Sequence, residues 1–254
     1  MFEKASSIYS KNIRTLSIVA LAQVFLGTIY YLVIKFLGGA TEIYKTHNLI
    51  GGTTINFDDT VAVYRNGSGS IILLGLIALI IGPMIACYVN VVIRKILKDE
   101  EINHKESFKE GLSFYWRYVG ISILIVLIIA ATSLCLGLIG MMFSVIPILN
   151  IIVVIAMFIG IICASIILIP CTHVMIYDDL AISEAFSRGT DIGKNHFWGI
   201  VGVGILTGII SSIVDLVGGA FDFILVFMIV TFINLMIENF LIMYYMVLCK
   251  EESI

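Results

Sequence analysis

The sequence predicts an all-α membrane protein, a single domain of residues 1–254 with six transmembrane helices and three pseudo-repeats. Composition gives the first reason: 60% of the 254 residues are hydrophobic and 13% are charged, whereas soluble domains carry about 25% charged residues. The second reason is six continuous apolar runs, each long enough for a helix to cross a hydrocarbon core of about 30 Å. Continuous runs favour helices over the alternating strands of a barrel. The expected spans are 16–37, 71–93, 119–143, 148–169, 198–217 and 221–248.

The distribution of lysine and arginine predicts the orientation of these spans. With both termini inside, twelve of the fifteen basic residues fall on the inner side and three, Lys35, Lys45 and Arg65, on the outer side. This asymmetry follows the positive-inside rule, so both termini are expected in the cytoplasm. The first apolar run is too long for a signal peptide and is expected to remain a span. The five cysteines lie in or beside spans and are expected to be apolar fillers without disulfides.

The segments outside the spans are of two kinds. Residues 1–15 form a basic amphipathic lead-in that is expected to lie along the inner membrane surface. The outer loop 38–70 contains two β-rich runs around Asp58–Asp59, which predict a small hairpin. The two aspartates could bind a cation, although acids at a turn are usually turn residues. A glycosylation sequon begins at Asn66.

The inner loops 94–118 and 170–197 are expected to hold amphipathic surface helices around 98–114 and 180–195, which together form a cytoplasmic collar. Ser107 and Glu110 have the spacing of a capping box.

An internal repeat relates these loops. Pro83 and Pro170 occupy corresponding places late in the second and fourth spans, and each precedes acids, a helix start and an aromatic or basic entry to the next span. A third partial copy precedes the first span, where Ser10–Asn12 resembles Gly193–Asn195. Three units, each a surface helix with a hairpin of spans, account for the chain.

The second inner loop also carries a resemblance to a known group. Its pattern is a proline, a short apolar run, two acids, Glu-Ala-Phe, and then Lys-Asn with an aromatic residue. This pattern resembles a broad group of bacterial six-span proteins, which includes the membrane domain fused to some glycerophosphodiester phosphodiesterases. The resemblance implies the fold and a bacterial inner-membrane location; the phosphodiesterase domain is absent, so hydrolase activity is not implied. The matching residues are Pro170, Asp178, Asp179, Glu184, Ala185, Phe186, Lys194, Asn195 and Trp198.

The last span contains the clearest candidate for intramembrane chemistry, because an ionisable residue in lipid is costly. Glu238 shares one helical face with Thr231, Asn234 and Tyr245. This polar stripe could relay cations or protons, or bind a polar substrate. Alternatively, Glu238 could be an interhelical latch that hydrogen-bonds Gln23, Asn90 or Asn150.

Other polar groups are weaker candidates. Asp215 and Asp222 flank the outer turn and could form an acidic mouth, or could simply be solvated. Asp178, Asp179 and Glu184 resemble a carboxylate cluster near His173 and His196, but their spacing matches no metal-ligand motif, and helix capping explains acids at such positions.

Together these patterns predict a protein without a catalytic site, metal or cofactor. The small residues Gly204 and Gly208 predict close helix packing, within the bundle or between subunits. No nucleotide-binding or hydrolase motif is present. The preferred hypothesis is a non-enzymatic scaffold, accessory or immunity-type component that contacts lipid or a membrane protein, without nucleic acid. The alternative is a small transporter or channel subunit with a pathway around Glu238.

Overall fold

The computed structural model describes residues 1–36, 79–142, 147–219 and 223–252, and within these ranges it is all-helical, with eight helices. The predicted hairpin, the Asp58–Asp59 pair, the sequon at Asn66, and Asp222 lie outside the described residues. The helices are α1 (Phe2–Lys11), α2 (Ile13–Phe36), the helix Leu79–Leu97, α5 (His104–Met142), α6 (Pro147–Tyr177), α7 (Ile182–Asn195), α8 (Phe197–Gly219) and α9 (Ile224–Glu252).

The predicted all-α membrane architecture is confirmed. Five of the described helices are long and apolar enough to cross a membrane, and α1 with α2 makes a sixth candidate. The axes of α1 and α2 differ by 79°, so α1 is a separate helix at the end of the first span. This agrees with the predicted amphipathic lead-in.

The structure confirms one of the two predicted inner-loop helices and corrects the other. The segment 180–195 forms the separate helix α7, as predicted. The predicted surface helix 98–114 is wrong as a separate element, because residues 98–103 are not helical and α5 runs without a break from His104 to Met142. No proline interrupts the interfacial segment of α5, so nothing prevents the surface turns from continuing into the span.

The start of α5 also differs from the predicted capping box. The helix begins three residues earlier than Ser107, with Asn103 at the N-cap: Asn103 Oδ1 accepts a hydrogen bond from the backbone N–H of Lys105 at 3.1 Å. Ser107 therefore lies inside the first turns and is fully buried. Glu110 is free to pair with another helix instead of capping its own.

Two span helices end in the same kind of turn. Asp99 follows Leu79–Leu97 and Asp179 follows α6, and both have left-handed φ angles, of 54° and 55°. In each turn the next N–H bonds back five residues, which is the Schellman closure of a helix C-terminus. The bonds are Glu100 N to Lys95 O at 2.9 Å and Leu180 N to Met175 O at 3.1 Å.

These turns fix the register of the repeat and correct one prediction. Pro170 lies about two turns before the end of α6, whereas Pro83 lies about four turns before Leu97. The two prolines are therefore not equivalent. The structure instead aligns the segments that follow each turn: Glu106–Gly111 reads Glu-Ser-Phe-Lys-Glu-Gly and Glu184–Gly189 reads Glu-Ala-Phe-Ser-Arg-Gly.

Each of these segments packs on the helix that precedes it, through small residues. A Cβ on Gly111 of α5 would lie 3.0 Å from the backbone nitrogen of Tyr88. On α7, a Cβ on Gly189 or Gly193 would collide with the backbone of α6 at Cys171 or Ile167. Such close helix contacts require glycine, because any side chain would separate the two backbones.

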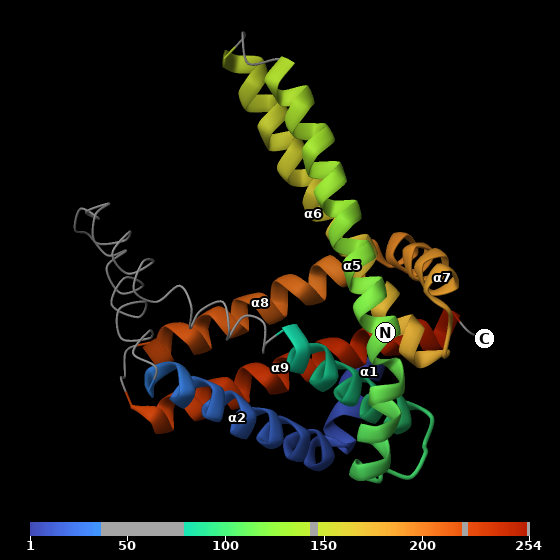
Figure 1. The fold of residues 1–254 in the computed structure, drawn as a ribbon, viewed down its shortest axis with the longest axis vertical. Coiled ribbons are helices and arrows are strands. Elements are labelled where there is room, and N and C mark those ends of the chain that lie inside the picture. The colour runs from blue at the N-terminus through green and yellow to red at the C-terminus, as the bar shows by residue number, and fades with distance from the viewer. Residues whose placement is uncertain (37–78, 143–146, 220–222, 253–254) are drawn as a thin grey trace.

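The third surface segment packs on the last span of the chain. α1 packs on α9, the last span, through the ring of Phe240, which contacts Phe2 and Tyr9 edge-on at centroid distances of 5.6 and 5.4 Å. Each surface segment thus lies on the end of a span: α5 on Leu79–Leu97, α7 on α6, and α1 on α9. The N-terminus and the last turns of α9 lie at this end of the molecule (Figure 1).

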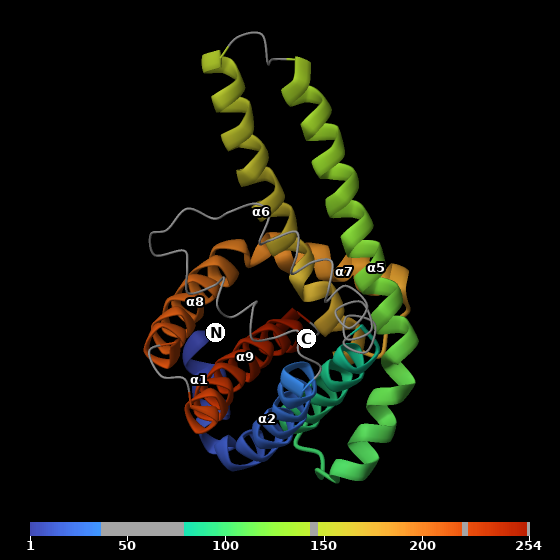
Figure 2. The same cartoon turned by 60° about the vertical axis from the view of Figure 1, so that its left-hand side comes forward.

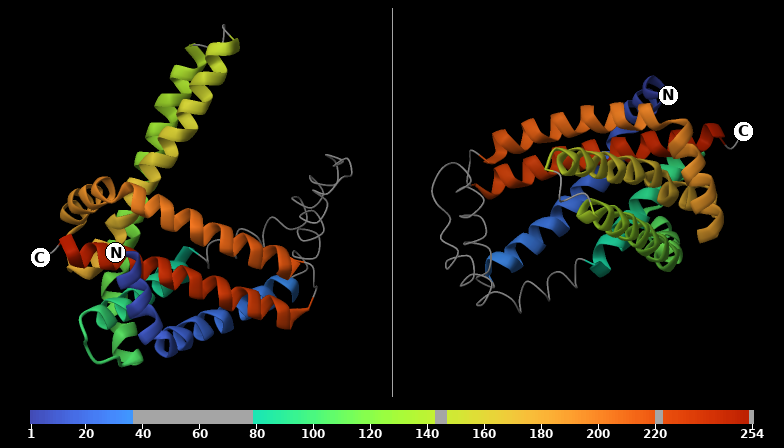
Figure 3. Two further views of the ribbon diagram at one scale, coloured as in Figure 1. Left: turned by 180° about the vertical axis from the view of Figure 1, so that it is seen from behind. Right: turned by 90° about the horizontal axis from the view of Figure 1, so that it is seen from above.

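We call this end of the molecule the base: α1, α7, the first turns of α5, and the C-terminal turns of Leu79–Leu97, α6 and α9. The buried core lies here, including Ile93, Ile176 and Leu248, all 0% exposed. Away from the base, the α5–α6 hairpin extends in one direction and α2, α8 and α9 in another (Figures 1 and 2). Figure 3 shows the same separation from behind. The outer parts of these helices expose large apolar side chains, as expected of surfaces that face lipid.

Candidate functional site

The two aspartates of the inner-face motif lie in the base, and each is paired with a different arginine. Asp178 pairs with Arg188 of α7 at 3.0 Å. Asp179 pairs with Arg117 of α5 at 2.8 Å, and the same guanidinium donates to the carbonyl of Leu180 at 3.3 Å. These pairs fasten the α6–α7 turn to its neighbours. No group of three metal-ligating side chains is present among the described residues.

Burial changes the pKa of Asp178 more than its ion-pair partner does. Desolvation raises the pKa of Asp178 above 3.8, although nearby Arg188 and Lys98 act in the opposite direction. Its Oδ2 atom is buried and accepts no hydrogen bond from the described residues, so the arginine pairs with it by charge alone. An ion pair without an aligned hydrogen bond compensates poorly for lost hydration.

A matching ion pair with reversed charges joins α5 to Leu79–Leu97. Here Glu110 lies on the surface segment and pairs with Arg94 and with Lys95, the latter at 3.1 Å. Glu110 of α5 corresponds to Arg188 of α7 in the aligned hexapeptides. The third junction has its own pair, Lys4 with Glu251 at 2.8 Å.

Cations from one unit also cap helix ends of the next. Lys98 Nζ donates to the carbonyl of Tyr177 at 2.9 Å, and Arg94 Nη1 donates to that of Ile176 at 3.2 Å. Lys250 Nζ donates to the carbonyl of Leu97 at 2.6 Å. Cations are favourable at helix C-termini because the last carbonyls carry partial negative charge. Ion pairs and helix-end hydrogen bonds therefore connect the helices of the base and engage several of its charged residues.

The remaining motif residues do not converge on one point. Pro170 lies inside α6, and Glu184 is exposed in the first turn of α7, where it complements the helix dipole. Lys194 is exposed and lies 3.8 Å from Asp191 of the same helix. Asn195 is the last residue of α7 and is exposed. Trp198 begins α8 and is 80% exposed.

A buried polar contact that the sequence analysis did not identify joins three spans near the base. His173 Nδ1 on α6 donates to Asn90 Oδ1 on Leu79–Leu97 at 2.8 Å. The ring of Tyr245 on α9 lies 5.2 Å from the imidazole, centroid to centroid. All three residues are buried. Asn90 is thus engaged with a histidine and not with Glu238.

The predicted stripe on α9 meets several neighbours instead of forming one site. Asn234 Nδ2 donates to Asp215 Oδ1 on α8 at 2.6 Å. Tyr245 lies against His173, and Thr231 is half-buried. Glu238 is exposed and interacts electrostatically with Tyr118 of α5.

The predicted latch does not form with the partners that the structure describes. Glu238 makes no hydrogen bond or ion pair with a described residue, and Gln23 Oε1 is buried without a hydrogen-bond partner in the described part of the chain. The side chain of Asn150 lies outside the described residues. The stripe was predicted from helical spacing alone, which orients side chains around one helix but does not say which neighbour each one meets.

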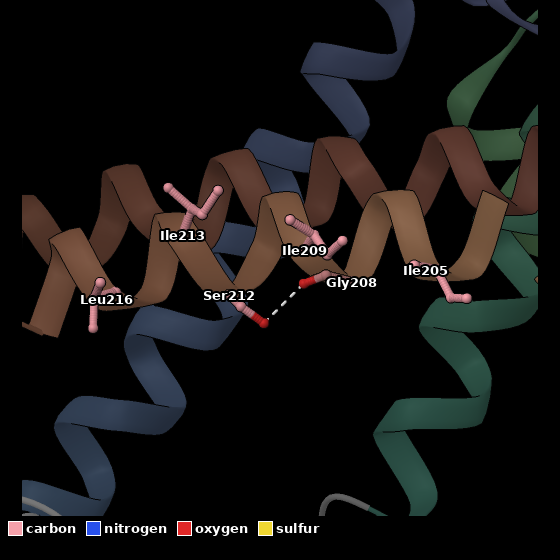
Figure 4. Close-up of a pocket in the computed structure, with 6 residues that line it drawn as sticks. All are labelled: Ile205, Gly208, Ile209, Ser212, Ile213 and Leu216. Carbon is pink, nitrogen blue, oxygen red and sulfur yellow. Dashed lines mark hydrogen bonds between the residues drawn. The ribbon is translucent and has the colours of Figure 1, made fainter. Parts of the chain in front are cut away.

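A shallow groove of about 530 Å³ runs along the outer part of α8 (Figure 4). Its lining is apolar apart from Ser212, whose hydroxyl donates to the carbonyl of Gly208 at 2.8 Å. A Cβ at Gly204 or Gly208 would meet no described atom within 4 Å. The predicted packing role of this pair is therefore not fulfilled within the described bundle. The groove residues are Ile205, Gly208, Ile209, Ser212, Ile213 and Leu216.

The packing glycines that the structure uses were present in the sequence as a second small-residue pattern. Ala185, Gly189 and Gly193 recur every four residues along α7, and all are buried against α6. This pattern lies in a polar helix, so the expectation of transmembrane packing motifs did not extend to it. Comparison of the chain with protein-family models, curated proteins and solved structures finds no match.

Proposed function

We propose that this chain is a non-enzymatic integral membrane protein, a scaffold, accessory or immunity-type component that acts through contacts with a membrane protein or with lipid. The observation that carries this proposal is the pairing of three carboxylates across helix junctions. Asp178, Asp179 and Glu110 are all paired across helix junctions. A catalytic carboxylate needs an orientation toward substrate, whereas these carboxylates hold helices together.

Exposed aromatic residues next to the base support a contact surface. Trp198 is 80% exposed and packs edge-on against Phe197 at a centroid distance of 5.3 Å. Trp116 is 78% exposed and packs in the same way against Tyr115 at 5.2 Å. Tryptophan at such positions suits both the membrane interface and protein contacts, because its ring is large and carries one polar group.

The proposed location is a bacterial cytoplasmic membrane, with the base and both termini in the cytoplasm. The excess of basic residues in the segments that form the base supports this orientation. We also propose that this chain is related to the group of bacterial six-span proteins that includes the phosphodiesterase-linked membrane domains.

Purification from membranes in a mild detergent tests the contact function. The quantity to measure is the stoichiometry of co-purifying proteins, by mass spectrometry, for the natural chain and for Trp198→Ala. We expect a partner near one-to-one that is depleted by the substitution, because large aromatic anchors carry much of the energy of an interface. Leu216→Ala is the matched control, since Leu216 is 79% exposed but lies far from the base on α8. Equal recovery of every co-purifying protein with Trp198→Ala and with Leu216→Ala would contradict the proposal.

The second candidate function is a small transporter or channel subunit, which the environment of Glu238 favours. Glu238 is an exposed residue of the apolar span α9, and its carboxyl makes no hydrogen bond with a described residue. Such a group is available to bind a proton or a cation. Proteoliposome flux assays distinguish the two functions: ion or proton flux that Glu238→Gln abolishes would favour transport, and absence of flux would favour the scaffold.

A further inference from the structure

The three surface segments contact their spans through different kinds of residue. α7 and the start of α5 approach their spans through glycines, whose missing side chains let backbones touch. The sequence of α1 contains no glycine, and its buried residue is Ala5, which is 0% exposed. We propose that α1 is a reversible clasp, which docks on α9 to close the base and swings away about Asn12.

One buried polar side chain of α9, next to the residues that contact α1, has no hydrogen-bond partner among the described residues. Asn239 lies on the face of α9 that carries Met236 and Phe240, and it is 1% exposed. Neither its Oδ1 nor its Nδ2 has a hydrogen-bond partner among the described residues. In the proposed clasp, opening returns water to both atoms, whereas the closed base offers them no described partner, so closure is opposed at this residue.

Two residues of α1, Tyr9 and Lys4, make polar side-chain contacts with α9. Tyr9 donates its hydroxyl to the carbonyl of Met236 at 2.8 Å, and its ring packs on Phe240. The ion pair of Lys4 with Glu251 lies at the surface, with side chains 48% and 30% exposed. Exposed pairs of this kind contribute little to stability.

The connection to α2 is built as a bend. Asn12 ends α1 with φ −108° and ψ 15°, and its backbone N–H bonds to carbonyls inside α1. The two helices that it joins differ in direction by 79°. A change in the dihedral angles of this residue moves α1 without altering the span. The view from above in Figure 3 shows α1 at the edge of the structure.

Labelling of Ala5→Cys with N-ethylmaleimide in the membrane-embedded full chain tests this clasp. The native Cys87 and Cys171 are the controls, because both are 0% exposed and lie beneath the glycine-packed segments. We expect the thiol introduced at position 5 to react about tenfold or more faster than the two native thiols, measured by peptide mass spectrometry. Reaction within about twofold of the native thiols would overturn the proposal.

Two further variants identify the cause. Asn239→Leu keeps the shape of the side chain but removes its polar atoms, so labelling at position 5 should slow about fivefold or more. Lys4→Gln should speed it about two- to fivefold, with no change at Cys87 or Cys171. If Asn239→Leu leaves the rate unchanged, the clasp is not poised by this residue and the proposal fails. Hydrogen exchange of the natural chain gives a measurement without substitutions: the amides of α1 should exchange faster than those of α7, and equal protection would contradict the clasp.

Discussion

The strongest structural prediction concerns Gly189, where α7 touches the backbone of α6. A Cβ at this position would collide with the backbone of Cys171, which cannot rotate away as a side chain could. Gly189→Ala must therefore lift α7 from α6. Overpacking of this kind costs about 1–3 kcal/mol, and helix propensity returns up to about 1 kcal/mol of it. At about 2–4 °C per kcal/mol, the melting temperature should fall by several degrees.

The assay is thermal unfolding of the purified chain in one detergent, followed by the loss of the monodisperse peak in size-exclusion chromatography. Gly208→Ala is the control, because a Cβ there meets no described atom within 4 Å. The control should melt at or slightly above the natural temperature, since alanine favours the helix. If Gly189→Ala melts as high as Gly208→Ala, α7 does not lie on α6 as described.

Four further predictions follow from the polar contacts. Because its pKa is raised on folding, Asp178 binds a proton more tightly in the folded chain than in the unfolded chain. The stability that this proton contributes is complete below about pH 3.8 and declines as pH rises through the folded-state pKa. Melting temperatures of Asp178→Asn, measured across a pH series, should lack that decline. Asn90→Ala leaves His173 without its acceptor and should cost about 1–3 kcal/mol in detergent unfolding, whereas a change below 0.5 kcal/mol would argue against the buried pair. Lys98→Ala removes a cap from the C-terminus of α6 and should cost about 0.3–1 kcal/mol in the same assay. This loss must be seen at low salt if Lys98 caps the helix. Glu238→Gln should leave the melting temperature unchanged, and a large loss of stability would instead support an interhelical latch.

The number and type of the span helices could be predicted because apolar length alone decides them in lipid. The separate helix α7 was also predictable, since its polar composition sets it apart from α6 and α8. The continuity of α5 was not, because interfacial residues such as Trp116 are compatible with either a break or an uninterrupted helix. That choice depends on tertiary packing, here the contact of Gly111 with Tyr88.

The candidate site was less predictable than the fold. The sequence placed Asp178 and Asp179 side by side, but their partners Arg188 and Arg117 come from two different helices. Likewise, the pair of His173 with Asn90 joins residues far apart in the chain. Side-chain pairing between helices depends on their relative rotation and register, and hydropathy carries neither. The repeat hexapeptides became recognisable only after the two Schellman turns had fixed the alignment.

Surface helices are docked on span ends by specific contacts, and a double-mutant cycle on Asp178 and Arg188 tests this docking most directly. The free energy of unfolding is measured for Asp178→Asn, Arg188→Met and the double variant, with the exposed pair Asp191 and Lys194 as a reference cycle. We expect a coupling of about 0.5–3 kcal/mol for the docked pair and less than about 0.5 kcal/mol for the exposed pair. Additive effects at Asp178 and Arg188 would show that α7 is not held on the end of α6 in the way described.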